Sequence, residues 1–106
     1  MGTDVDVADD RWLRGVRAAL TAQFEEQTAR LTQLTADTGD PGEVDTHAAL
    51  VAATRRGLEQ VTGALTRLAE GRYGVCEGCA APMPRERLEV LPHARFCVPC
   101  QSRRGR

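Results

Sequence analysis

Apolar residues recur in steps of three and four over the first third of the chain, which is the spacing of a helix with one apolar face. The apolar positions are Leu13, Val16, Leu20, Phe24, Leu31 and Leu34, and Gln27 fills the one polar place among them. The same spacing forms the seam of a coiled coil. We therefore predict a helix over residues 10–34. At 1.5 Å per residue it would extend about 40 Å, so it should project from a protein of this size.

A turn and a second helix of the same kind follow. Residues 36–42 read ADTGDPG, a composition typical of a turn between two helices. Asp40, Pro41 and Glu43 match the N-cap, N1 and N3 positions of a capping box, so the second helix should start there. Arg67 suits its last turn, and Gly71 is placed to end it.

The second helix has its own apolar seam. Its members are Val44, Ala48, Val51, Leu58, Val61, Leu65 and Leu68, with Thr54 as the polar one. Because the connection is short, the two helices should lie antiparallel. We predict a mainly α fold: an antiparallel two-helix coiled-coil hairpin over residues 10–70, with its tip at about 36–43. A small head over residues 71–106 would follow, with a short C-terminal helix or tail.

Four cysteines lie in the predicted head, in the spacing C-x2-C-x17-C-x2-C. Each C-x2-C turn directs two thiolates to one point, and Zn²⁺ prefers a tetrahedron of four such ligands. We predict one zinc ion per chain, bound by Cys76, Cys79, Cys97 and Cys100. Since four thiolates close the shell and leave no position for a substrate or a water, the zinc should be structural.

Other interpretations of these residues carry less weight. Buried thiols or redox pairs would not need two equal pairs confined to residues 76–100. His93 lies four residues before Cys97 and could replace a cysteine ligand, but four thiolates already suffice. His47 is interpreted as a solvated helix residue.

Composition supports one small protein with two unlike ends. The chain has 106 residues, a net charge of −1 and only 4% aromatic residues, which suits one domain built of packed helices. Residues 1–70 hold 7 Arg and 12 acidic residues, whereas residues 71–106 hold 7 Arg and 3 Glu. An acidic arm and a basic head should meet different surfaces.

The N-terminus, residues 1–9, should be a flexible acidic segment. A signal peptide would be hydrophobic at the positions of Asp4, Asp6, Asp9 and Asp10. Nothing approaches the roughly 18 apolar residues that span a membrane. We expect a cytoplasmic protein, and in that reducing compartment paired cysteines favour metal over disulfides.

The run GRYGVCEGCAAPMPRERLEVLPHARFCVPC resembles the C4-type zinc finger of the DksA/TraR family. The shared features are a Gly-x-Tyr-Gly lead-in, two cysteine pairs, the step at Arg87 and Leu88, and the Pro-x-Ala step at Pro92 and Ala94. An upstream coiled-coil hairpin is the other hallmark of that family. The resemblance is specific over residues 65–100 and architectural over residues 10–64.

The resemblance implies a bacterial transcription regulator that binds RNA polymerase and inserts its hairpin into the secondary channel, where acidic tip residues act near the active centre. It implies no direct sequence-specific DNA binding. We also expect no membrane contact, because no apolar run is long enough, and we expect a monomer. The family's Asp-x-x-Asp-x-Ala tip pattern is altered here, because Asp40 and Asp45 are five residues apart. Both are candidates for partner contact, and Asp40 also suits a helix cap.

Two other classes of function remain as alternatives. A zinc-ribbon nucleic-acid-binding or scaffold protein would use the basic head and the SRRGR tail, but the head has few aromatic residues for base stacking. An enzyme is not expected, because the chain shows no Ser triad, no paired His and carboxylate, and no Gly-rich phosphate loop.

Overall fold

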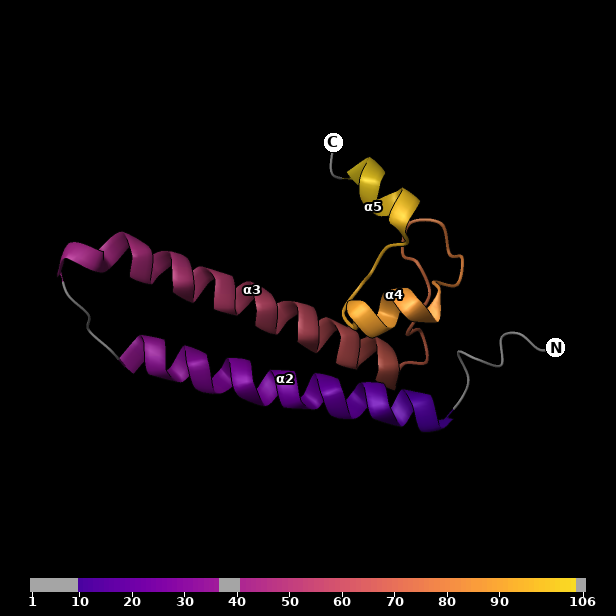
Figure 1. The fold of residues 1–106 in the computed structure, drawn as a ribbon, viewed down its shortest axis with the longest axis horizontal. Coiled ribbons are helices and arrows are strands. Elements are labelled where there is room, and N and C mark those ends of the chain that lie inside the picture. Colours follow the sequence, from indigo (N-terminus) through magenta and orange to yellow (C-terminus); the bar gives the residue numbers. More distant parts are fainter. Residues whose placement is uncertain (1–9, 37–40, 105–106) are drawn as a thin grey trace.

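The computed structural model describes residues 10–36 and 41–104. Helix α2 (Asp10–Ala36) has 27 residues and helix α3 (Val44–Ala69) has 26, and the short 3-10 helix η1 (Pro41–Glu43) comes directly before α3. The two long helices lie side by side and antiparallel (Figure 1). The molecule measures 59 × 33 × 20 Å. The predicted mainly α fold with a projecting hairpin is confirmed.

The interior of the hairpin follows most of the predicted seam. Val16 and Leu20 are buried on α2, and Thr54 and Val61 are buried on α3. The Thr54 hydroxyl donates a hydrogen bond of 2.8 Å to the carbonyl oxygen of Leu50 in its own helix. The seam therefore accommodates a polar residue without leaving its hydroxyl unpaired.

The seam differs from the prediction away from the head. Phe24 is 40% exposed and Val44 is 61% exposed, and Ala48 is exposed as well. His47, which we expected in solvent, is half-buried instead. A heptad assignment places residues on a face only approximately, and here the interhelical face of α3 runs through His47 and Val51 rather than through Ala48.

The two ends of α3 are built differently. At its start, Glu43 makes no side-chain capping hydrogen bond, and Asp40, the predicted cap, lies outside the described residues. At its end, Gly71 has φ +76°, its N–H donates to Leu68 O, and the N–H of Arg72 donates to Arg67 O. This is the Schellman pattern, for which a glycine at the left-handed position is the favoured residue.

The head packs beside the base of the hairpin, the end away from the turn (Figure 1). It contains helices α4 (Arg85–Val90) and α5 (Val98–Arg104) and an isolated antiparallel bridge between Val75 and Pro82. One buried cluster joins head and hairpin. Its members are Val16, Leu20, Val61 and Ala64 from the hairpin, and Tyr73, Cys76, Met83, Leu88, Ala94, Phe96 and Cys100 from the head.

Within the described part of the chain, no helix is both long enough and apolar enough to cross a membrane. The predicted flexible N-terminal segment, residues 1–9, lies outside the described residues, as does the middle of the predicted tip, residues 37–40.

Candidate metal centre

The first cysteine pair lies in a tight turn that closes on itself. The N–H of Ala80 donates to the Cys76 carbonyl at 2.9 Å, and the N–H of Cys76 donates to the Ala81 carbonyl at 2.9 Å. Ala80 takes a left-handed backbone conformation, with φ +66°, to complete the turn. These bonds hold Cys76 and Cys79 on one side of the turn.

The second pair lies at the start of α5. Cys97 directly precedes the helix, and its carbonyl accepts the N–H of Gln101 at 2.8 Å. Cys100 lies within α5 and is buried. The two pairs thus come from unrelated local structures, a turn and a helix start, and tertiary packing brings them together.

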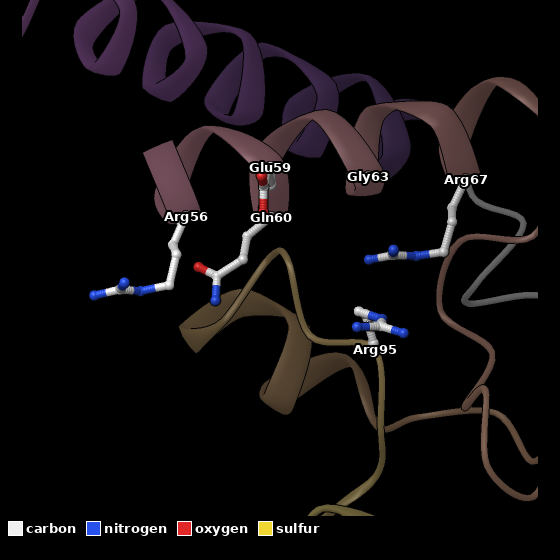
Figure 2. A pocket seen from close by; sticks show the side chains of 6 residues that line it. All are labelled: Arg56, Glu59, Gln60, Gly63, Arg67 and Arg95. Atoms are coloured by element: carbon white, nitrogen blue, oxygen red, sulfur yellow. The ribbon is translucent and has the colours of Figure 1, made fainter. Parts of the chain in front are cut away.

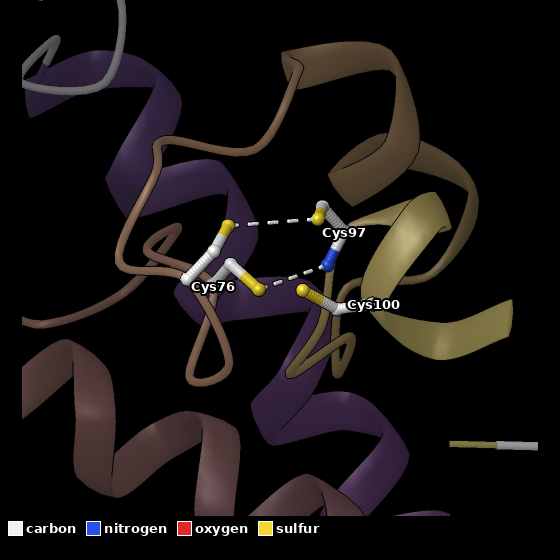
Figure 3. A group of neighbouring side chains, drawn as sticks. Cys76, Cys97 and Cys100 are labelled. Atoms are coloured by element: carbon white, nitrogen blue, oxygen red, sulfur yellow. Dashed lines mark hydrogen bonds between the residues drawn. The ribbon is translucent and has the colours of Figure 1, made fainter. Parts of the chain in front are cut away.

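The four sulfur atoms form one cluster. All four Sγ atoms lie within 4.8 Å of one another, and those of Cys79 and Cys97 are 3.8 Å apart. Figure 3 shows the sulfur atoms of Cys76, Cys97 and Cys100 directed at a common point. Four sulfurs about 2.3 Å from one zinc ion would be about 3.8 Å apart in a regular tetrahedron. The donor set therefore fits one tetrahedral Zn²⁺.

Backbone N–H groups surround the sulfur of Cys76. Those of Gly78 and Cys97 each donate to it at 3.3 Å. The hydrogen bond from Cys97 is the largest cause that lowers the pKa of the Cys76 thiol to about 6. Burial raises the pKa of Cys100 to about 12. A bound divalent cation would hold both groups as thiolates.

Gly78 is required by space rather than by backbone conformation. A Cβ atom at this position would lie 3.0 Å from the Sγ and 3.3 Å from the Cβ of Cys100. From the sequence, this glycine would be explained by the freedom of a turn. The structure shows that it lets the first pair approach the second.

His93 lies outside the sulfur cluster. It is not among the residues whose donor atoms come together, within the described part of the chain. It is half-buried beside Arg67, and burial is the larger cause that lowers its pKa. The structure thus gives it no place in the first coordination shell.

Sequence reasoning missed a charged link between arm and head. Arg67 is buried, and its guanidinium donates to the carbonyl oxygens of His93 and Ala94 at 3.3 and 3.4 Å. It also lies 3.6 Å from Glu77, which Arg95 contacts at 2.9 Å. Arg67 was expected only to complement the end of its helix. The one signal for this link in the sequence was Glu77, the acidic residue between Cys76 and Cys79.

The residues that carry the family resemblance hold the head together. The Tyr73 hydroxyl donates to the Pro92 carbonyl at 2.7 Å, and burial raises the pKa of Tyr73 to about 12. The Arg87 Nε donates to the Phe96 carbonyl at 2.9 Å. The ring of Trp12 on α2 lies 6.3 Å from that of Tyr73. These contacts fix the segment between the two cysteine pairs against the hairpin.

Of the two acidic residues expected at the tip, the structure describes one, Asp45, which lies at the end of the hairpin away from the head (Figure 1). Asp45 is exposed in the first turn of α3, and Asp40 lies outside the described residues. Asp45 is therefore not part of the sulfur cluster.

Comparisons with known proteins agree with this geometry. The Prokaryotic dksA/traR C4-type zinc finger model matches residues 71–105. General stress protein 16O of Bacillus subtilis is 47% identical over 45 residues, which are 42% of this chain and 28% of that protein. The RNA polymerase-binding transcription factor DksA of Caulobacter vibrioides is 34% identical over 79 residues, 71% of this chain and 56% of that one. The chain thus spans less than two thirds of either relative.

A solved structure shares the fold. The transcription factor DksA2 from Pseudomonas aeruginosa superposes with a TM-score of 0.75, at 24% identity, over 92% of this chain and 85% of that one. The matched zinc finger and the clustered cysteines confirm the prediction of one structural zinc ion.

Proposed function

We propose that this chain, a member of the DksA/TraR C4-type zinc-finger family, is a bacterial transcription regulator that binds RNA polymerase. The name of the Caulobacter relative supports this partner, since that protein is an RNA polymerase-binding transcription factor. Such a partner would place the action of the chain in the cytoplasm.

The observation that carries the proposal is the length of the hairpin compared with its core. Helices of 27 and 26 residues extend about 40 Å. The buried cluster, however, lies only at their base. Farther out, Leu50 is 50% exposed and Val44 is 61% exposed. A projection that buries so little of its own surface is better suited to entering a partner than to stabilising its own domain. Insertion into the secondary channel of the polymerase would use that shape.

The head would set the direction of the projecting hairpin. We propose that Cys76, Cys79, Cys97 and Cys100 bind the zinc ion. A closed shell of four thiolates has no catalytic position, so the proposed role is non-catalytic. The chain would act as a monomer on the polymerase, with no sequence-specific recognition of DNA and no membrane contact.

At the tip, Asp45 is the better candidate for a contact near the polymerase active centre. Its exposure in the first turn of α3 leaves it accessible to a partner. Asp40 is the alternative, with the helix cap as its other expected role.

The test combines binding and regulation. The zinc-loaded chain should bind core RNA polymerase in a pull-down and change transcription in vitro from a promoter that forms unstable open complexes. The Asp45→Ala variant should bind and melt like the wild type but lose the effect on transcription. Glu43→Ala is the matched control, because it removes a neighbouring exposed acid. Wild-type regulation by Asp45→Ala would contradict the role of the tip.

One observation favours a second candidate function. Arg103 and Arg104 are exposed residues of α5, next to the sulfur cluster. Arg103 donates to Cys100 Sγ at 3.1 Å, and the Arg104 guanidinium lies 4.4 Å from the Phe96 ring centroid. Exposed arginines suit nucleic-acid phosphates. A DNA mobility shift at physiological salt, run beside the pull-down, separates the two. Binding to DNA without binding to polymerase would favour the zinc-ribbon or scaffold alternative.

A further inference from the structure

An arginine on α5 contacts the sulfur cluster from outside. Cys100 and Arg103 are three residues apart in α5, so their side chains share one face of the helix. The Arg103 guanidinium donates a hydrogen bond of 3.1 Å to Cys100 Sγ. We propose that Arg103 is a positioning residue of the metal centre, and that its hydrogen bond to Cys100 slows the loss of zinc. The proposal rests on zinc binding by the four cysteines and does not depend on polymerase binding.

The donor set creates a charge that needs compensation. Four thiolates bring twice the charge of one Zn²⁺, so the loaded centre is an anion. Two of its sulfurs belong to buried cysteines, Cys76 and Cys100, and buried charge is costly unless it is paired and hydrogen-bonded. A guanidinium that donates to one of these sulfurs supplies both a positive charge and a hydrogen bond. Such a contact is stronger than one between neutral groups.

The two buried sulfurs receive their hydrogen bonds from different kinds of donor. Cys76 Sγ accepts from the backbone N–H groups of Gly78 and Cys97, each at 3.3 Å. Cys100 Sγ accepts from the side chain of Arg103. A backbone donor is fixed by the turn that carries it, whereas a side-chain donor can be removed by substitution. The contribution of Arg103 can therefore be measured without a change to the backbone around the cysteines.

Two other arginines close to the centre have an acidic partner instead. Figure 2 shows Arg67 on α3 and Arg95 on the head. Both contact the carboxylate of Glu77, at 3.6 and 2.9 Å. Glu77 thus takes up positive charge that would otherwise face the cysteines. Of these three arginines, Arg103 is the one whose contact is with a sulfur atom.

A hollow beside Cys100 gives solvent a route to this sulfur. It has a volume of about 410 Å³, and its lining includes Gly78, Phe96, Cys100, Arg103 and Arg104. The Arg104 guanidinium lies 4.4 Å from the centroid of the Phe96 ring, whereas that of Arg103 holds the sulfur. A chelator that attacks Cys100 through the hollow would have to displace Arg103. Outer-shell hydrogen bonds of this kind change metal affinity by about 10–100-fold.

The first experiment measures zinc release from the full-length, zinc-loaded chain into an excess of a chromogenic chelator. Arg103→Ala should release zinc about tenfold faster than the wild type, the lower end of the range for outer-shell partners, because Arg103 is exposed. Arg103→Lys keeps a charged donor and should release zinc more slowly than Arg103→Ala. Equal rates for Arg103→Ala and the wild type would overturn the proposal, and so would equal rates for the two variants.

Arg104→Ala is the matched control. It removes the same charge one residue farther along α5, from a side chain that lies on the Phe96 ring, and should release zinc at the wild-type rate. If it released zinc as fast as Arg103→Ala, the general charge of α5 would explain both results and the proposal would be overturned.

Cobalt provides a readout that a loss of helix stability would not give. In the Co²⁺-loaded chain, Arg103→Ala should shift the sulfur-to-metal charge-transfer band, because the hydrogen bond draws electron density from the sulfur, and Arg104→Ala should leave the band in place. An unchanged band in Arg103→Ala would contradict the contact with the sulfur. A chain that bound no metal would overturn the zinc site and this proposal together. Polymerase binding is measured separately, so its failure would leave the role of Arg103 standing.

Discussion

The base and the outer half of the same hairpin are stabilised in different ways. At the base, Leu20 and Ala64 are completely buried among side chains of both long helices and the head. In the outer half, no described residue in 21–36 or 42–53 is buried, and the interhelical positions Gln27, Leu31 and Val51 are only half-buried. The same heptad pattern thus gives a three-sided core where the head covers it and a thin two-helix seam where it does not.

This difference indicates that the head stabilises the base of the hairpin as well as its own fold. Two antiparallel helices alone bury a narrow strip, and isolated helices owe most of their stability to tertiary packing. The head supplies a third surface through Tyr73, whose ring lies 6.3 Å from that of Trp12 on α2. Two of its carbonyl oxygens also accept hydrogen bonds from Arg67. Among the described residues, the outer half packs against no third surface and is attached to the rest of the molecule only through the base.

Among the changes that test this comparison, removal of zinc should have the largest effect on stability. Binding of a structural zinc contributes about 10–16 kcal/mol to small metal domains, so chelation should unfold the head. The base would then lose its third surface, and the hairpin should keep part of its helical far-UV signal but melt at a lower temperature. Metal analysis before chelation should return one zinc per chain, and circular dichroism measures the melting.

The Cys97→Ser variant is the companion to chelation. Added zinc should restore the chelated wild type but not this variant. Unchanged melting of the hairpin after zinc loss would contradict the shared core. Freshly purified protein that contained intramolecular disulfides and no metal would contradict the zinc site itself.

Two leucines on α2 allow a direct comparison of the packing at the base with the packing in the outer half. Leu20→Ala should lower the free energy of unfolding by about 2–5 kcal/mol, because it leaves a cavity in a fully buried site. Leu31→Ala changes the same residue type at a half-buried position and should cost only about 1 kcal/mol. Chemical denaturation of the zinc-loaded variants measures both. Equal losses would mean that the outer seam is packed as well as the base.

Glu77→Gln should have the smallest of the three effects. It removes the carboxylate shared by Arg67 and Arg95. Because Glu77 is 30% exposed, solvent screens part of the loss, and we expect about 1 kcal/mol. The amide keeps the shape of the side chain, so packing should be unaffected.

The stability that is lost in the Glu77→Gln variant should depend on pH in a definite direction. The hydrogen bond from Arg95 is the main cause that lowers the pKa of Glu77 below its usual 4.5. The stabilisation that Glu77 provides is therefore fully present above pH 4.5. It is lost only as the pH falls through the lower pKa that Glu77 has in the folded state. The difference between wild type and Glu77→Gln should be constant from about pH 6 to 8. A difference that grew within this window would point to another titrating group.

Local patterns predicted much of the fold. The steps of three and four predicted both long helices, and Gly71 ends α3 as expected, since a C-terminal glycine acts through its own backbone conformation. Phe24, Ala48 and His47 were placed less well. Which edge of a seam is covered depends on how the helices rotate against each other, and periodicity alone does not determine that rotation.

By itself, the sequence determined the mainly α class, the hairpin and the one structural zinc, because helix periodicity and the two C-x2-C turns are properties of neighbouring residues. That Cys76, Cys79, Cys97 and Cys100 all bind it, and that Asp45 contacts a partner, stay predictions. Only the tertiary structure decided what surrounds the centre. Arg67 finds its carbonyl partners 26 and 27 residues away, and Gly78 is explained by a sulfur on another element. Such contacts depend on how separate elements pack, so the spacing of residues along the sequence does not predict them.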